Sequence, residues 1–122
     1  MKYLTFLFAI VLFADFAQAE TDKIKAGLQG NAWIKFSEME KVIYLKGIYS
    51  GIMLGQSSER ENYITDAHMK TVEDGINEFY ADFRNRNIFV IFALKIVSRQ
   101  LRGDSLEVID ADVLRYRELF SR

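Results

Sequence analysis

The chain of 122 residues contains no cysteine and no proline, and it has a single histidine. The lack of cysteine excludes a disulfide scaffold, a cysteine nucleophile, a thiolate metal site and a lipidated N-terminal cysteine. A single histidine excludes a metal site built from several imidazoles. Charges nearly balance, with 16 Lys and Arg against 17 Asp and Glu. We therefore expect no nucleic-acid partner and no acidic disordered tail.

The first 19 residues have the features of an export signal. Lys2 precedes a nearly unbroken apolar run over 3–14, and an Ala-x-Ala cleavage site follows at 17–19. The run is shorter than the roughly 20 apolar residues that a membrane span needs. We therefore expect a cleaved signal peptide over 1–19, a single exported domain over 20–122, and no stable membrane span. The alternatives are a buried N-terminal helix or strand and an uncleaved anchor.

An arm docked by Trp33 precedes four expected helices. Ser37 and Glu40 form a capping box that opens the first helix, which we expect to run to about Gln56. The others are expected over 71–85, over 88–101 and from 104 onward, with Thr71, Asn87 and Asp104 as caps. The third segment also permits a strand, but its length favours a helix. The sequence thus predicts an all-α domain, a compact bundle of about four helices.

The second half of the first helix is apolar on every side, because no charge occurs from Gly47 to Gln56. We therefore expect this helix to be the central, buried one. Gly47, Gly51 and Gly55 share one face, although each glycine inside a helix costs about 1 kcal/mol relative to alanine. We interpret this face as a close-packing surface for another helix. The alternatives are a groove for a ligand or partner and, at Gly55, simple helix termination.

The second helix has the clearest amphipathic pattern of the chain. Its apolar stripe, which we expect to face the core, comprises Val72, Ile76, Phe79, Tyr80 and Phe83. Its solvated face is expected to comprise Glu73, Asp74, Asn77, Glu78, Ala81, Asp82 and Arg84.

No combination of residues predicts a catalytic centre. The chain lacks the nucleophile elbow, the zinc-protease, phosphate-loop and dinucleotide motifs, and the ligand spacing of a calcium loop. The carboxylates are explained as helix caps and solvated faces, and His68, in a polar segment over 56–70, as a solvated side chain. We therefore expect no enzyme, no cofactor and no metal site.

A polar and aromatic cluster follows the second helix, over 79–87. It is explained either as a helix terminus or as a polar rim beside an aromatic wall, suited to a carboxylate, a sugar or a partner loop. The candidate binding surface of the chain comprises Trp33, Lys41, Tyr44, Tyr80, Asp82, Arg84 and Asn85.

Two motifs resemble those of known proteins. They are W-x5-M-x-K-x2-Y-x2-G-x3-G over 33–51 and F-Y-x-D-x-R-N over 79–85. Together they resemble a group of small exported bacterial proteins, over about 33–117, and imply no activity. The first motif is more distantly similar to periplasmic immunity proteins of the Rap/Tai kind, which neutralise amidase toxins delivered by type VI secretion. The resemblance implies that Trp33, Lys41 and Tyr44 are framework positions.

These expectations favour a small exported protein, periplasmic or secreted, that works by binding another periplasmic protein. The alternative is a binder of a small ligand or a cell-wall fragment. That alternative would use Tyr44, Tyr80, Asp82 and Arg84 around the glycine face, and it would require a pocket of a few hundred Å³. A hydrolase would require two carboxylates, or His68 and a hydroxyl, to converge.

Overall fold

The computed structural model describes residues 27–55, 60–63 and 65–121. The predicted signal peptide, over 1–19, lies outside the described residues. The described chain forms a bundle of packed helices, which confirms the predicted all-α fold. Within it, no helix combines the length and the hydropathy that crossing a membrane requires.

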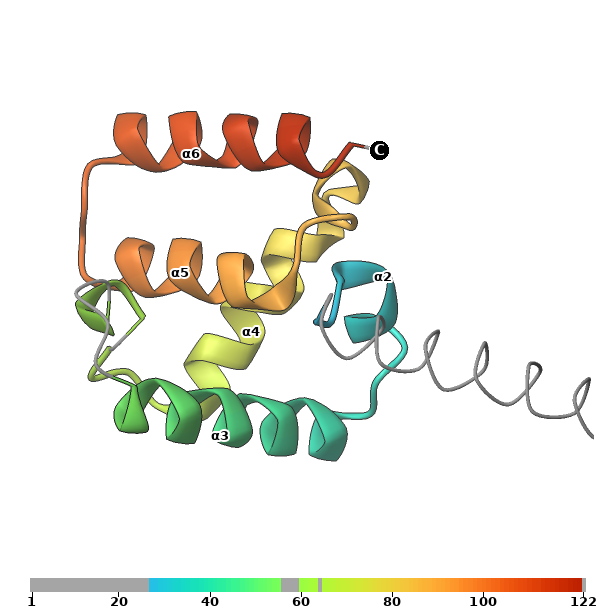
Figure 1. Ribbon diagram of the computed structural model, residues 1–122, viewed down its shortest axis with the longest axis vertical. Coiled ribbons are helices and arrows are strands. Elements are labelled where there is room, and N and C mark those ends of the chain that lie inside the picture. The colour runs from blue at the N-terminus through green and yellow to red at the C-terminus, as the bar shows by residue number, and fades with distance from the viewer. Residues whose placement is uncertain (1–26, 56–59, 64, 122) are drawn as a thin grey trace, which may run out of the picture.

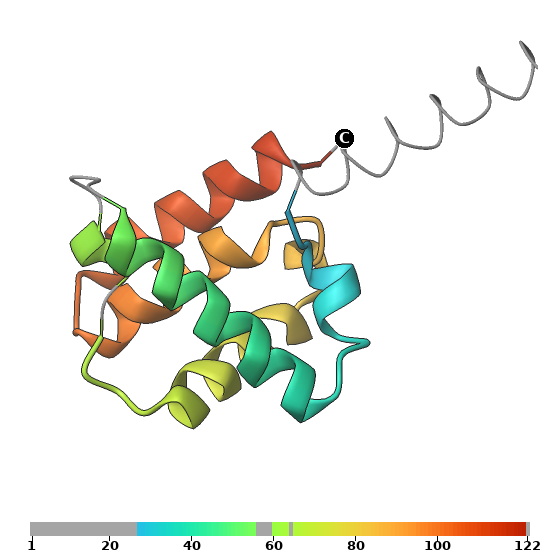
Figure 2. The ribbon, with the colours of Figure 1, turned by 60° about the horizontal axis from the view of Figure 1, so that its bottom comes forward.

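Four long helices and a short one are stacked with a single oblique crossing. They are α2 (Gly30–Trp33), α3 (Glu38–Leu54), α4 (Met69–Ala81), α5 (Val90–Leu101) and α6 (Leu106–Leu119), with the 3₁₀ turns η1 (Arg60–Asn62) and η2 (Phe83–Asn85). Figure 1 shows α3, α5 and α6 one above another, with α4 crossing behind them. The main contacts of α4 are with α3 and α5, and those of α6 are with α5. Figure 2 shows the same arrangement with α3 on the near side.

The capping box that opens α3 is confirmed. The Ser37 hydroxyl accepts a hydrogen bond from the Glu40 N–H at 3.2 Å, and the Glu40 carboxylate accepts one from the Ser37 N–H at 2.7 Å. The helix ends at Leu54 because Gly55 is extended, with φ −74° and ψ 153°. Gly55 therefore terminates α3, as one of the alternatives had it.

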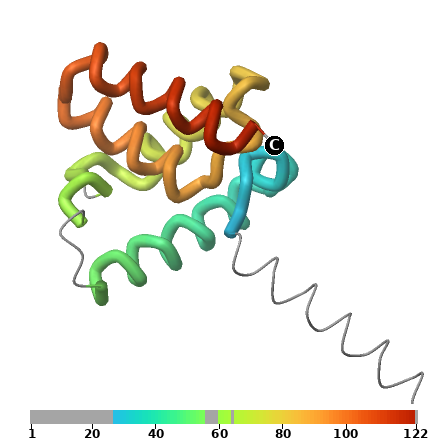
Figure 3. The backbone as a smooth tube through the Cα atoms, turned by 45° about the horizontal axis from the view of Figure 1, so that its top comes forward, coloured from blue at the N-terminus to red at the C-terminus, as the bar shows by residue number. Residues whose placement is uncertain are grey.

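The central helix is α5, and the prediction that α3 is central is wrong. Only Leu45 of α3 is fully buried, and α3 keeps an apolar outer side in solvent. By contrast, half of α5 is buried, namely Val90, Ala93, Leu94, Ile96, Val97 and Ser98. In Figure 3, α5 lies between α3 and α6. A helix segment that is apolar on every side is therefore not necessarily the central one.

Residues of α5 belong to two separate groups of buried side chains. The larger group is Trp33, Leu45, Val72, Ile76, Tyr80, Val90, Ala93, Leu94 and Val97. The smaller group is Ile88, Ile96, Ile109 and Tyr116. The core is thus two sub-cores that share α5.

The close helix crossing lies at Gly75 of α4 and not at the predicted glycine face of α3. A Cβ atom on Gly75 would lie 2.6 Å from Val97 Cγ1, so α4 and α5 approach closely because residue 75 has no side chain. A Cβ on Gly47 or Gly51 would meet no described atom within 4 Å. The interpretation of Gly47 and Gly51 as a packing surface for another helix of this domain is therefore wrong.

The amphipathic pattern of α4 is confirmed where Val72, Ile76 and Tyr80 are buried. Both ends of the helix differ from the prediction. It begins at Met69, with His68 at the N-cap, instead of at Thr71. It ends at Ala81, because Asp82 is extended and η2 turns the chain. As a consequence Phe83, predicted to be buried, is 74% exposed.

The last two helices form where they were expected but without the predicted caps. Their N-cap residues are Phe89 and Ser105, and neither makes a side-chain capping bond. Asn87 instead accepts a hydrogen bond from the Asn31 amide at 3.1 Å. Asp104 accepts from Arg99 and Arg102, at 3.2 and 2.8 Å. Segment 88–101 is thus mainly helical, as predicted, and not a strand.

The two kinds of glycine predict opposite effects of the same substitution. Gly75→Ala should destabilise the fold by about 1–2 kcal/mol, because the methyl group overlaps the stiff Val97 side chain. Gly47→Ala should stabilise it by up to about 1 kcal/mol, because alanine favours the helix and meets nothing. Thermal unfolding followed by circular dichroism measures both. A Gly75→Ala variant as stable as its Gly47→Ala counterpart would contradict the crossing.

Candidate functional site

The structure divides the predicted binding surface into two clusters and one buried link. Trp33, Lys41 and Tyr44 lie near the junction of α2, α3 and α4. Asp82, Arg84 and Asn85 lie at η2, beside α6. Three of the seven predicted residues are 4% exposed or less, namely Trp33, Tyr80 and Asn85. These three support the surface from beneath and do not form it.

Asn77 holds the first cluster together. Its side-chain oxygen accepts one hydrogen bond from the Trp33 indole N–H at 2.9 Å and another from the Lys41 ammonium at 3.0 Å. The same ammonium lies 5.5 Å from the centre of the Trp33 ring, which favours a cation–π contact. Asn77 was predicted to face solvent, and this is corrected: it satisfies a buried indole. The cluster is therefore a framework joint.

The two tyrosines of the predicted surface have different environments. Tyr80 is fully buried and donates its hydroxyl hydrogen to the Ile88 carbonyl at 2.9 Å. Burial strongly raises the pKa of Tyr80, so it stays a neutral structural donor. Tyr44 is half-buried, with its ring edge-on to Trp33 and Phe36. Burial raises the pKa of Tyr44 as well, and a hydrogen bond to the Leu28 backbone partly opposes this.

Asp82 anchors the second cluster. Arg84 donates to both oxygens of the Asp82 carboxylate, the shortest contact being 2.7 Å, and Arg117 of α6 donates to it at 3.0 Å. Arg117 also donates to the Asn85 oxygen at 2.7 Å, and the Asn85 amide donates to the Phe79 carbonyl at 2.7 Å. Hydrogen bonds from Arg84, with the nearby charge of Arg117, hold the pKa of Asp82 well below its usual range. The cluster ties η2 to α6.

A polar cavity of about 370 Å³ lies beside this second cluster. Its lining is Gly75, Glu78, Phe79, Asp82, Asn85, Gln100 and Leu106. Three residues of the predicted polar and aromatic cluster line it, namely Phe79, Asp82 and Asn85. The two charged lining residues, Glu78 and Asp82, are both acidic. A carboxylate ligand is therefore disfavoured here, and the side chains of Asp82 and Asn85 are already engaged within the protein.

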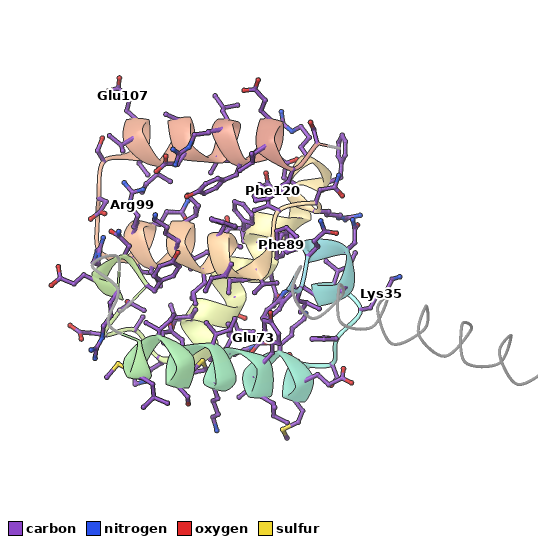
Figure 4. The ribbon with its side chains drawn as sticks, in the orientation of Figure 1. Lys35, Glu73, Phe89, Arg99, Glu107 and Phe120 are labelled. Carbon is purple, nitrogen blue, oxygen red and sulfur yellow. The ribbon has the colours of Figure 1, made fainter. Side chains whose placement is uncertain are left out.

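A second hollow region, the α3–α5 groove, is apolar. It consists of two adjoining pockets of about 450 and 370 Å³. The first is lined by Gly27, Leu28, Tyr44, Ile48, Phe89, Ile91, Phe92 and Phe120. The second is lined by Ile48, Gly51, Ile52, Gly55, Arg60, Tyr63 and Ile91. Figure 4 shows two of these residues, Phe89 and Phe120, near each other, and their ring centres are 5.1 Å apart.

The groove bears on the alternative that the protein binds a small ligand around the glycine face of α3. Tyr44, Gly51 and Gly55 do line a hollow of the expected size. Tyr80 is buried in the core against which Tyr44 packs, whereas Asp82 pairs with Arg84 and lines the separate polar cavity. Of the four residues proposed to surround the glycine face, only Tyr44 lines the groove.

Glu73 is a buried carboxylate that the amphipathic pattern had placed in solvent. It is 1% exposed, and its Oε1 has no hydrogen-bond partner among the described residues. The Lys70 ammonium lies 3.7 Å away, but it also pairs with Asp74 at 3.0 Å and Glu38 at 3.5 Å. Figure 4 labels Glu73 close to α3. Glu73 precedes Ile76 by three residues and Tyr80 by seven, so helical spacing places it at the edge of the buried stripe. Its charge is what assigned it to the solvated face.

Comparison of the chain with protein-family models, with curated proteins and with solved structures finds no match. Within the described ranges, no group of three or more acidic, histidine or cysteine side chains is placed to hold a metal ion.

Glu73→Met should stabilise the protein by about 1 kcal/mol or more, because it replaces an incompletely hydrogen-bonded buried carboxylate with an apolar side chain of similar length. Lys70 keeps its other two partners. Glu78→Met, an exposed position of the same helix, should change stability by less than about 0.5 kcal/mol. Chemical denaturation of both variants checks this, and a lower midpoint for Glu73→Met would show that the carboxylate is well satisfied.

Asp82 should make stability depend on acid pH. A carboxylate whose pKa is lowered in the folded state stabilises that state above its usual pKa of 3.8, and the contribution is lost as pH falls toward the folded value. The melting temperature of Asp82→Asn should therefore lie below that of the wild type at about pH 7. Below about pH 3.8, the difference in melting temperature between Asp82→Asn and the wild type should narrow. Asp110→Asn, at an exposed position without an ion pair among the described residues, serves as the control. A pH-independent difference for Asp82→Asn would contradict the prediction.

Proposed function

We propose that the chain is an exported protein that acts by binding another protein, through the outer face of α3. This face consists of Met39, Ile43, Gly47, Met53 and Leu54. Its four larger side chains are 69%, 61%, 54% and 87% exposed in that sequence order, although they lie on a helix whose other side packs on the core. Lys46 and Ser50 are also exposed on this side, so the apolar side chains form two groups, Met39 with Ile43 and Met53 with Leu54. Large apolar side chains exposed together on one helix face are typical of an interaction site. That surface is the observation that carries the proposal.

Two further features support protein binding. A Cβ atom added to Gly47, on the same face, would meet no described atom within 4 Å, so no contact inside the domain offsets the helix stability that this glycine costs. Its lack of a side chain leaves a flat place where a partner can approach. The predicted polar and aromatic residues serve mainly as internal joints, and this supports binding more than catalysis. An immunity-like role in the periplasm agrees with the proposal and rests on the resemblance of the motif over 33–51.

Small-ligand binding is a second candidate function, because the α3–α5 groove has the size of a small-molecule site. Its apolar lining does not suit a cell-wall fragment, which is rich in hydroxyl and amide groups.

A photo-crosslinking experiment tests the protein-binding proposal. A benzoylphenylalanine residue replaces Ile43 on the outer face of α3 in one variant, and Glu107 on the outer side of α6 in the other (Figure 4). Irradiation of cells that export the protein should give a discrete protein adduct from position 43 and none from position 107. The crosslinked chain should begin at Glu20 if the signal peptide is removed as predicted.

The same adduct should disappear when an additional Leu54→Glu substitution places a charge on this face. Adducts of equal yield from positions 43 and 107, or none from position 43, would contradict the use of this face.

A further inference from the structure

We infer that the α3–α5 groove binds a single amphiphile with a hydrocarbon tail and an anionic head group, such as a long-chain carboxylate, with the head group at Arg60. The inference rests on the ligand-binding candidate. No residue of the outer face of α3 lines the groove, although Met53 of that face contacts Arg60. The occupant is a monomer rather than a membrane surface, because the hollow lies between two helices.

The shape of the groove suits an extended chain. Ile48 of α3 and Ile91 of α5 line both pockets, so the two pockets are continuous. From Tyr44 to Gly55, α3 rises by about 16 Å along this hollow, at about 1.5 Å per residue. Along this length the lining is aliphatic and aromatic apart from one end. A tail would therefore remove apolar surface from water on both walls, which is the main driving force for such binding.

The charge of the groove selects the head group. Among the described residues, Arg60 is the only charged one that lines these two pockets, and none of their lining side chains is acidic. Lys35 lines a further pocket that adjoins the opposite end of the groove through Gly27, Leu28 and Phe89. The helices on both sides agree, since α5 has no Asp or Glu and α3 has none after Glu40. A long flank without negative charge that ends at a cation complements an anion with an apolar tail.

Arg60 is placed to receive that anion. Its guanidinium contacts the Met53 sulfur at 3.1 Å, and no carboxylate among the described residues pairs with it. An arginine binds a carboxylate through two parallel hydrogen bonds, and these are stronger than bonds between neutral groups.

Gly51 keeps the wall of the groove open beside Arg60. A Cβ atom there would meet nothing within 4 Å, so a larger side chain would project into the hollow without a clash inside the domain. Gly51→Leu therefore provides a variant that fills the groove and leaves the fold intact.

Isothermal titration calorimetry of the exported chain tests the inference. The probes are dodecanoate and dodecyltrimethylammonium, which share one tail and differ in head-group charge, both below their micelle concentrations. Dodecanoate should bind the wild type, and Arg60→Gln should weaken that binding about tenfold. Gly51→Leu should abolish it without lowering the melting temperature. Lys35→Gln, which removes a cation beyond the opposite end of the groove, should change it less than about twofold.

Several results would overturn the inference. Equal affinity for the two probes, or equal binding by Arg60→Gln and the wild type, would contradict the placement of an anionic head group at Arg60. A loss on Lys35→Gln alone would place the head group at the wrong end. Binding to anionic phospholipid vesicles without binding to the monomer would indicate a membrane surface instead. All four results leave the crosslinking from Ile43 unaffected, so the two proposals fail separately.

Discussion

The arrangement of this bundle depends on the close approach of α4 and α5 at Gly75 and Val97. Because residue 75 has no side chain, α4 crosses tightly against α5 and covers one side of it, while α6 covers another. This contact makes α5 the shared wall of both sub-cores. The tight crossing also fixes where Asn77 and Glu73, on the same helix, meet the rest of the molecule.

α3 is bound to the bundle mainly through α4. Its contacts are concentrated around Leu45 and the Trp33–Lys41–Asn77 joint, and its far half is less covered. Two surfaces follow from this one-sided attachment. One is the outer face of α3, and the other is the groove left between α3 and α5. Both include apolar side chains from the second half of α3, which carries no charge on any side although the helix is not central.

Local signals in the sequence predicted the elements well, and long-range packing explains where they failed. The Ser37–Glu40 capping box, the stripe around Ile76 and the helix over 88–101 depend on neighbouring residues, and the structure confirms them. The choice of central helix depends on which apolar helix the others cover. Amino-acid composition does not indicate which helix the others cover. The sequence therefore predicts the wrong central helix and does not indicate the close crossing at Gly75.

The candidate site was predictable in part for the same reason. The run over 79–87 was recognised as a polar junction, but the partner that completes it, Arg117, comes from another helix. Phe83 was expected in the core because the amphipathic pattern continues past Ala81, whereas the backbone turns at Asp82. The groove gave no signal of its own, since its lining combines residues from segments far apart in the chain.

The position of the only tryptophan gives the molecule a built-in optical reporter. Trp33 is fully buried where α2, α3 and α4 join, so its emission reports the hydration of the larger sub-core. The smaller sub-core, around Ile109 and Tyr116, contains no tryptophan, so tryptophan emission does not report on it. Tryptophan emission therefore observes one sub-core, whereas helical circular dichroism observes all the helices of the chain. Agreement or disagreement between the two signals distinguishes a single cooperative unit from two sub-cores that melt in turn.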